Sequence, residues 1–158
     1  MSGLSPPTKS KAMALLLDKA VFRFTGDAGK FLNGITTNRQ DAAHNAFVDV
    51  KGRIIAVVDQ FRVDDETTYV LLERRFAERL KAHLEKFLAI SSTRLAEVDR
   101  RVYFSLSEDE PSGSVFVIPQ AKGRLFVLKQ PMKENLTREA YTLCRVLNRM
   151  PLQGVDFD

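Results

Sequence analysis

The chain has 158 residues, of which 44% are hydrophobic and 28% charged, and this suits one globular protein of ordinary size with a full core. Its formal net charge is +4, but the 24 Lys and Arg are spread without a block of five like charges, so the sequence shows no electrostatic footprint for nucleic acid and does not favour such a partner. One Cys and two His exclude an intrachain disulfide and a Cys/His zinc site within one chain, so we expect no metal.

The N-terminal part of the chain shows no targeting or membrane signal. No apolar run approaches the ~20 residues that span a bilayer, so we expect no membrane partner. The single Cys is typical of a reducing compartment and predicts a cytoplasmic protein. Residues 1–14 are rich in Ser, Pro and Lys and predict a disordered arm, after which Leu15–Leu17 begins a strand or a short helical turn.

The first regular elements are a strand and a short helix. Val21–Phe24 alternates and predicts a strand that Gly26 ends. Asp27 is a residue type that caps helices, and the helix that follows places its apolar residues on one face. These residues are Ala28, Phe31, Leu32 and Ile35.

A β-hairpin is predicted next, and the chain is organised around it. Phe47–Val50 and Ile54–Val63 are apolar, β-branched runs that flank Lys51, Gly52 and Arg53. The second run is apolar at every position in its middle, which favours a central strand covered on both faces. Asp59 interrupts this run and is costly in a buried strand, so it lies either in a polar cavity or at a sheet boundary. A central hairpin with one tolerated acid is the alternative.

The hairpin is followed by three further elements. Thr68–Leu72 predicts a strand, and Phe76–Leu88 predicts the clearest amphipathic helix because its apolar residues recur every four positions. Val98–Leu106 predicts another strand. Residues 15–107 therefore follow the α+β, ferredoxin-like βαββαβ order, an antiparallel sheet with helices on one face.

The remaining residues, 108–158, predict a partial second unit of the same kind. An acidic linker, Glu108–Gly113, precedes two strands, Val115–Ile118 and Leu125–Leu128, around a turn. A final helix begins near Asn135 or Thr137, and Pro151 ends it. Its predicted buried side consists of Ala140, Leu143, Cys144, Leu147 and Met150.

Residue chemistry by itself points to no catalytic group. Cys144 lies on an apolar helical face with neither His near it in sequence, His44 lies in a polar loop, and His83 is expected on a helix surface. The segment Gly34–Arg39 gathers two hydroxyls, an amide and a guanidinium, which either contact a polar ligand or form a capped turn.

Four segments carry a family resemblance, in the right order. Asp27–Asn38 follows the pattern D-A-x-x-F-L-x-G-x-x-T-N/D, and Lys51–Ile55 follows x-G-R and two hydrophobic residues. Phe76–Leu88 is similar to an L-x₃-L helix, and Arg145–Asp156 resembles R-[hydrophobic]₂-x-G-x-P-x-x-G-x-D, with Arg149 at the first glycine position. Over roughly Leu15–Asp158 the chain resembles a truncated N-terminal folate-binding domain of the YgfZ proteins and their relatives, the glycine cleavage T-proteins (aminomethyltransferases).

The resemblance implies a ligand and its contacts. The cofactor would be tetrahydrofolate or a similar pteridine with an anionic glutamate tail. Candidate contacts are Thr37, Asn38, Arg53 and Arg62, with Asp59 as the candidate acid. Arg suits a carboxylate tail because its fork matches both oxygens.

The resemblance also implies what this chain lacks. The family's catalytic Asp falls at Ala56 or Val57, both apolar, so no catalytic residue is assigned. A folate-contacting Asn of the T-proteins falls near Glu73. The K-G-C-Y-x-G-Q-E signature and the C-terminal barrel lie beyond the matched segment.

Four functions remain open. The first is a non-catalytic folate-binding protein, linked to one-carbon metabolism or iron–sulfur protein maintenance. The second is an aminomethyltransferase, which needs a positioned base. The third is a scaffold subunit that has lost folate binding, and the fourth is a basic nucleic-acid binder. Because a half-ring exposes strand edges and apolar surface, we expect a homodimer or a complex with another folate-family subunit.

Overall fold

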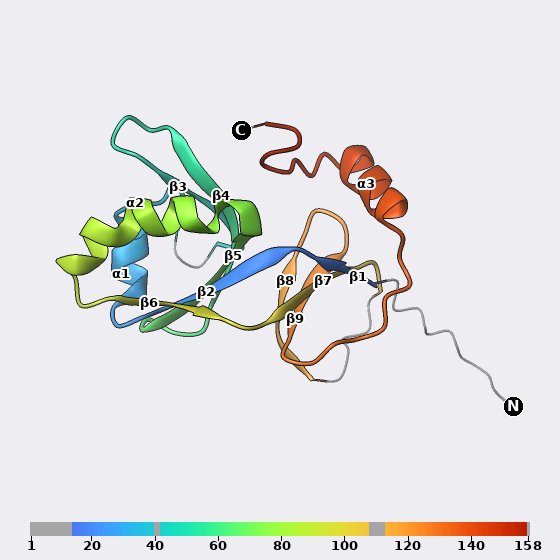
Figure 1. Cartoon of the computed structure of the whole chain (residues 1–158), viewed down its shortest axis with the longest axis horizontal. Coiled ribbons are helices and arrows are strands. Elements are labelled where there is room, and N and C mark those ends of the chain that lie inside the picture. Colours follow the sequence, from blue (N-terminus) through green and yellow to red (C-terminus); the bar gives the residue numbers. More distant parts are fainter. Residues whose placement is uncertain (1–13, 40–41, 108–112, 158) are drawn as a thin grey trace, which may run out of the picture. The chain divides into compact units, whose positions relative to one another are not determined.

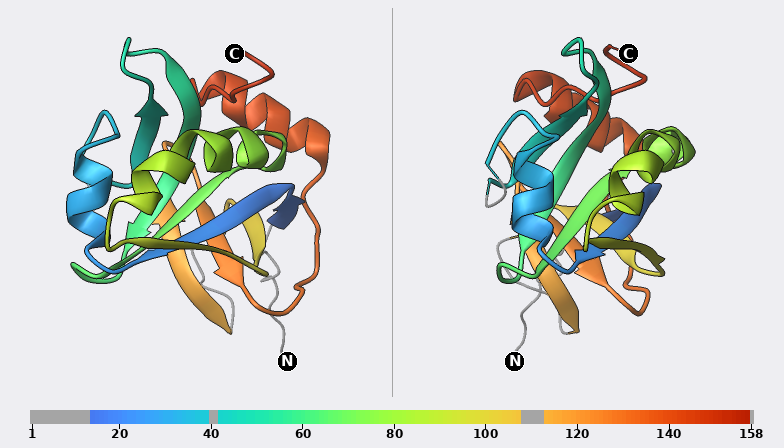
Figure 2. Two further views of the ribbon diagram at one scale, coloured as in Figure 1. Left: turned by 60° about the vertical axis from the view of Figure 1, so that its left-hand side comes forward. Right: turned by 90° about the vertical axis from the view of Figure 1, so that its left-hand side faces the viewer.

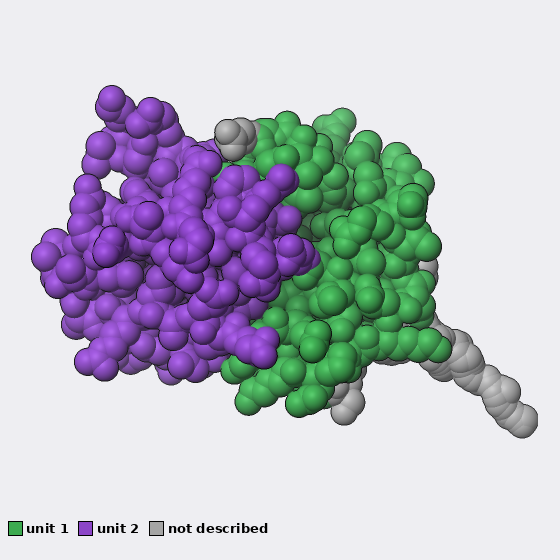
Figure 3. Space-filling view, viewed as in Figure 1, with its two compact units in different colours: residues 1–17, 100–158 green, residues 18–99 purple. Residues whose placement is uncertain are grey.

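The computed structural model describes residues 14–39, 42–107 and 113–157, which belong to two compact units (Figure 3). The central unit is Asp18–Asp99, and the terminal unit combines Met1–Leu17 with Arg100–Asp158. The predicted arm and the predicted acidic linker fall largely outside the described residues. Among the residues that are described, no helix is both long and apolar enough to cross a membrane.

The central unit is a five-stranded antiparallel sheet in the order β3-β4-β5-β2-β6, with two helices (Figure 1). Strands β4, β5, β2 and β6 with α1 and α2 form the ferredoxin-like arrangement, and β3 adds an edge strand. The predicted α+β fold class is therefore confirmed. The elements are β2 (Lys19–Thr25), α1 (Ala28–Asn33), β3 (His44–Val48), β4 (Ile54–Arg62), β5 (Thr67–Glu73), the 3₁₀ turn η3 (Arg74–Phe76), α2 (Ala77–Ala89) and β6 (Arg94–Val98).

Both helices of the central unit pack on the same face of its sheet, as the two views of Figure 2 show. The core between them is built from Phe and aliphatic side chains, as the absence of Trp suggests. Leu80 and Leu84 of α2 are fully buried, which confirms the four-residue periodicity of the sequence. The fully buried Phe side chains of this core are Phe22, Phe24 and Phe47.

The central hairpin forms as predicted, with β3 and β4 antiparallel. Gly52 has φ 81, a left-handed conformation that side chains disfavour, so glycine suits the turn. The Asp49 carboxylate accepts from the backbone N–H groups of Lys51 and Arg53, both at 2.9 Å, and closes the turn. Strand β4 is second from the sheet edge rather than central, because β3 takes the edge position.

The expected capping of α1 by Asp27 is wrong. Asp27 occupies the N-cap position but has φ 57 and makes no side-chain hydrogen bond to the helix. The break before α1 depends on Gly26 instead, because a Cβ there would lie 2.6 Å from the carbonyl oxygen of Ser92. This close approach between distant segments leaves no mark in local sequence.

The terminal unit is a four-stranded antiparallel sheet in the order β1-β7-β9-β8, with one helix. The predicted hairpin is present as β8 and β9, and Thr137 caps α3 by accepting from the backbone N–H of Ala140 at 3.0 Å. Ala14, Tyr103, Phe126 and Leu128 cluster on one face of the sheet. The elements are β1 (Ala14–Leu17), β7 (Arg101–Ser105), β8 (Ser114–Pro119), β9 (Arg124–Leu128) and α3 (Arg138–Leu147).

The predicted strand Val98–Leu106 is wrong as a single element. The chain leaves one sheet after Val98 and enters the other at Arg101, so β6 pairs with β2 while β7 pairs with β1 and β9. The compact units accordingly divide before Asp18 and after Asp99, whereas the sequence suggested a boundary after residue 107. Three charged residues, Asp99, Arg100 and Arg101, occupy the junction, and the strand pairing shows that the chain changes sheets there.

The predicted buried side of α3 is also wrong. Tyr141 and Arg145 are its buried residues, whereas Leu143 and Leu147 are exposed and Cys144 is half-buried. Tyr141 packs on the Phe104 ring with centroids 4.9 Å apart. The helix is thus rotated so that much of its apolar stripe points away from its own unit.

Candidate functional site

The candidate site lies on the face of the central sheet opposite its helices. Because side chains alternate along a strand, the residues between those of the helix-side core point to this second face. Phe22 and Val70 point to the helices, so Val21 and Leu71 point away from them, and both are buried. The polar and aromatic residues that share this face are Lys19, Arg23, Asp59, Phe61, Tyr69 and Glu73.

Asp59 is the centre of a charged cluster on this face. Its carboxylate accepts a hydrogen bond from Nδ1 of His44 at 2.9 Å and lies 3.9 Å from the Nζ of Lys19. Lys19 also donates to Glu73 at 2.8 Å. The Lys19 and Asp59 side chains are 8% and 14% exposed, so water screens this interaction only in part. The charge of Asp59 is therefore paired in a polar patch on the sheet, which offsets the cost of a carboxylate in a largely buried strand.

The sequence did not point to His44 and Lys19 as parts of this cluster. His44 begins β3 rather than lying in a loop, and its strand register places it directly opposite Asp59. Lys19 lies 40 positions before Asp59, as their residue numbers show, and meets it because β2 and β4 both flank β5. The local sequence could have placed His44 in the cluster only through an alternation of polar and apolar residues that marks a strand.

An aromatic row lies beside the charged cluster. Phe61 on β4 pairs with Tyr69 on β5, which pairs with Arg23 on β2. Neighbouring strands are about 4.8 Å apart and a step of two residues covers about 7 Å, so Arg23 lies roughly 12 Å from Asp59 between Cα atoms. The face therefore combines a carboxylate, two aromatic side chains and a guanidinium in a span of molecular size.

Thr37 and Asn38 lie at the His44 end of the cluster. Asn38 donates through Nδ2 to the carbonyl oxygen of His44 at 3.1 Å, and its backbone N–H donates to Oδ1 of Asn45 at 2.8 Å. The Thr37 hydroxyl donates to the same Asn45 oxygen at 3.4 Å. Both candidates thus belong to a turn that Asn45 fastens to β3, and the turn holds His44 beside Asp59.

Arg53 and Arg62 are not brought to the cluster. Arg53 lies six residues from Asp59, about 20 Å along the strand, and its guanidinium donates to Asp49 at 2.8 Å. Arg62 is three residues from Asp59, so alternation places it on the helix side, where it pairs with Asp65. Each arginine supports the turn next to it.

Ala56 and Val57, the two apolar residues expected at the position of a catalytic acid, point to opposite faces of the sheet. Ala56 is fully buried in the helix-side core, and Val57 shares the face of Asp59. Asp59 lies one two-residue step, about 7 Å, further along the strand than Val57. Glu73, at the position of the expected Asn, holds Lys19. In the described part of the chain no group of three or more His, Cys, Asp or Glu could hold a metal ion.

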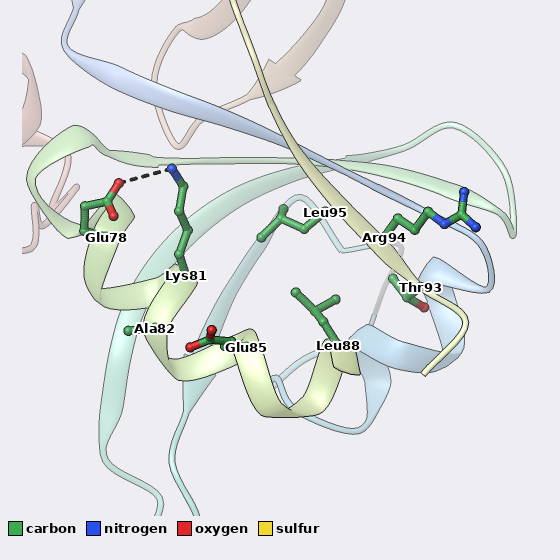
Figure 4. Close-up of a pocket in the computed structure, with 8 residues that line it drawn as sticks. All are labelled: Glu78, Lys81, Ala82, Glu85, Leu88, Thr93, Arg94 and Leu95. Atoms are coloured by element: carbon green, nitrogen blue, oxygen red, sulfur yellow. Dashed lines mark hydrogen bonds and ion pairs between the residues drawn. The ribbon is translucent and has the colours of Figure 1, made fainter. Parts of the chain in front are cut away.

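A groove of about 750 Å³ lies on the other side of the central unit, between α2 and β6 (Figure 4). Its walls carry Leu88 and Leu95 with the charged side chains of Glu78, Lys81 and Arg94. Lys81 bonds Glu97 at 2.7 Å and Glu78 at 3.1 Å, and these carboxylates raise its pKa. None of the expected site residues lines this groove, so the second face of the sheet remains the candidate site.

The fold and the site together define a class of protein, namely a ferredoxin-like unit with a paired carboxylate on the sheet face opposite its helices. Searches with the sequence find no matching family model and no matching curated protein. Among solved structures, the chain is similar to the glycine cleavage system aminomethyltransferase T from Bartonella henselae, with TM-score 0.56 and 12% identity. The match covers 74% of this chain and 42% of that one, so the chain spans less than half of the enzyme's length. At this identity the likeness establishes the fold.

Proposed function

We propose that this chain binds a reduced pterin with an acidic tail, tetrahydrofolate in particular, without transferring an aminomethyl group. The observation that carries the proposal is the Asp59 carboxylate, which His44 and Lys19 hold on the sheet face of a fold shared with an aminomethyltransferase. A link to one-carbon metabolism or to iron–sulfur protein maintenance would follow from such binding.

The chemistry of the ligand fits the face in three places. A pterin presents two adjacent N–H donors, and an ionised carboxylate offers about four acceptor sites on two oxygens, so Asp59 can accept from the pterin as well as from its protein partners. Phe61 and Tyr69 offer aromatic contact to the flat rings. Arg23, roughly 12 Å away, is a cation for the tail carboxylates.

Ala56 and Val57 are the reason that we propose binding without catalysis. General acid–base chemistry needs an ionisable group at the reacting atom, and neither apolar side chain supplies one. Asp59 lies about 7 Å beyond Val57, which is too far to act at the same atom without a shift of the ligand. Aminomethyl transfer is therefore the less favoured reading of the fold.

Isothermal titration with tetrahydrofolate and folinic acid tests the proposal. Asp59→Asn keeps the side-chain shape, leaves Lys19 bonded to Glu73, and should weaken binding about tenfold or more, since hydrogen bonds to charged groups contribute about 1.5–3 kcal/mol. Arg23→Gln should lower the affinity for ligands that carry the glutamate tail and leave the affinity for a pterin without the tail unchanged. Arg53→Gln is the matched control and should bind like the parent chain.

Two results would end the proposal. One is no heat with either ligand at millimolar concentration. The other is unchanged affinity in Asp59→Asn with a circular dichroism spectrum like that of the parent chain, because the ligand would then lie elsewhere. Turnover of an aminomethyl donor that Asp59→Asn abolishes would instead favour the aminomethyltransferase reading.

A further inference from the structure

Helix α3 presents its apolar residues to solvent. Leu143, Val146 and Leu147 are 59%, 63% and 71% exposed, and their i, i+3, i+4 spacing places them on one helical face. The opposite side of the helix is used for attachment. Tyr141 packs on Phe104, and the buried Arg145 donates to the Met150 carbonyl oxygen at 3.1 Å and to Asp156 at 2.5 Å.

This arrangement inverts the usual pattern of a surface helix, in which charged residues face water and leucines face the core. The rotation is held by specific contacts, since the Asp156 carboxylate also accepts from the backbone N–H of Leu152 at 2.8 Å. Turning the helix inward would break the Arg145 bonds. The apolar face, defined as Leu143, Val146 and Leu147, is therefore a stable feature of the terminal unit.

The two ends of the apolar face carry opposite charges. Glu139 lines a shallow hollow with Leu143 and Val146, and Arg149 lines another with Val146. Arg138 also lines the first hollow, but its guanidinium donates to the carbonyl oxygen of Leu16 at 3.5 Å. Within the described residues, neither the Glu139 nor the Arg149 side chain makes a hydrogen bond or an ion pair. Residue numbers place the two charges at equal distances, five positions, before and after Cys144.

We propose that α3 packs against α3 of a second copy of this chain, antiparallel, about a twofold axis near Cys144. A twofold interface must be complementary to itself, and this face is: antiparallel packing brings Glu139 of each copy to Arg149 of the other while the apolar faces meet between them. The occupant is thus a second copy, because the same patch supplies both the acid and the base.

The size of the face sets the strength of the contact. Ten helical residues span about 15 Å, so one helix per copy buries less than the roughly 800 Å² per partner of a standard stable interface. We therefore expect a reversible dimer whose population rises between low micromolar and near-millimolar concentration. Dimerisation through α3 does not require ligand binding, so a failed binding experiment would leave the dimer untouched and the reverse also holds.

Sedimentation equilibrium of the full chain tests the proposal. Leu147→Lys should raise the dimer dissociation constant about tenfold or more, because it places a charge in the apolar face of both copies. Ile90→Lys is the matched control, since Ile90 is 88% exposed in the central unit, and its dissociation constant should equal that of the parent chain.

A charge exchange separates this arrangement from a general hydrophobic association. Glu139→Arg and Arg149→Glu should each raise the dissociation constant about fivefold, since each puts two like-charge pairs at the interface. The double variant restores both pairs in reversed order and should return to within about twofold of the parent. A monomer at every concentration, or a dimer unaffected by Leu147→Lys, would overturn the proposal, and so would a double variant no better than the singles.

Discussion

Asn45 provides the sharpest test of how this structure holds its candidate site. The side chain is buried, and its Oδ1 accepts from the backbone N–H groups of Asn38 and Ala46, both at 2.8 Å. Its Nδ2 donates to the Thr36 hydroxyl at 3.0 Å and to Oε1 of the buried Gln60 at 3.3 Å. One amide therefore joins the turn, β3 and β4.

Asn45→Ala should lower the free energy of unfolding by about 3 kcal/mol. The Asn38 N–H, the Thr36 hydroxyl and the buried Gln60 amide are three of the partners that lose a bond, and each of these lost bonds costs about 1 kcal/mol. With a urea slope of about 2 kcal/mol per molar, the midpoint should fall by roughly 1.5 M.

Urea unfolding followed by circular dichroism measures this change, and hydrogen exchange at the Asn38 amide reports on the turn directly. Asn148→Ala is the control, because Asn148 is exposed at the end of α3 and donates to the Cys144 carbonyl oxygen. A midpoint within about 0.3 M of the parent value, with the Asn38 amide still protected, would refute the view that Asn45 fastens the turn.

Two further predictions follow from burial and from charge. Leu84→Ala should lower the free energy of unfolding, measured in urea, by about 3 kcal/mol because the Leu84 side chain of α2 is fully buried. Ile90→Ala, at an exposed position, should change this free energy little. The Leu152 N–H and then the Arg145 guanidinium lower the pKa of Asp156 below its ordinary value of 3.8. Since folding lowers this pKa, the stabilisation is present above about pH 4 and is lost as the pH falls through the folded value. An NMR titration should place the carboxyl midpoint of Asp156 below 3.8, and Arg145→Gln should raise it; a midpoint at the ordinary value would contradict the contact.

The predictions that succeeded concern elements with a local cause. The hairpin at Gly52 requires a residue that tolerates positive φ, and α2 repeats its leucines every four positions, so short windows of sequence contain the whole signal. Thr137 is a similar case, because an N-cap interacts with a backbone group three residues away.

The predictions that failed concern contacts between distant segments. Val98–Leu106 was predicted as one strand, but its two parts pair with different partners and belong to β6 and β7. Of the expected site residues, Asn38 lies beside the Asp59 cluster, whereas Arg53 and Arg62 are used in their own turns. The side chains that pair with Asp59 are Lys19 of β2 and His44 of β3.

Sequence by itself determined the order and type of most elements, and with them the ferredoxin-like arrangement, because periodicity, caps and turn residues act over a few positions. The tertiary structure decided which charges meet and which side of α3 faces outward. Those outcomes depend on pairs such as Lys19 with Asp59 and Arg145 with Asp156, whose energies arise only when the chain brings them within a few ångströms.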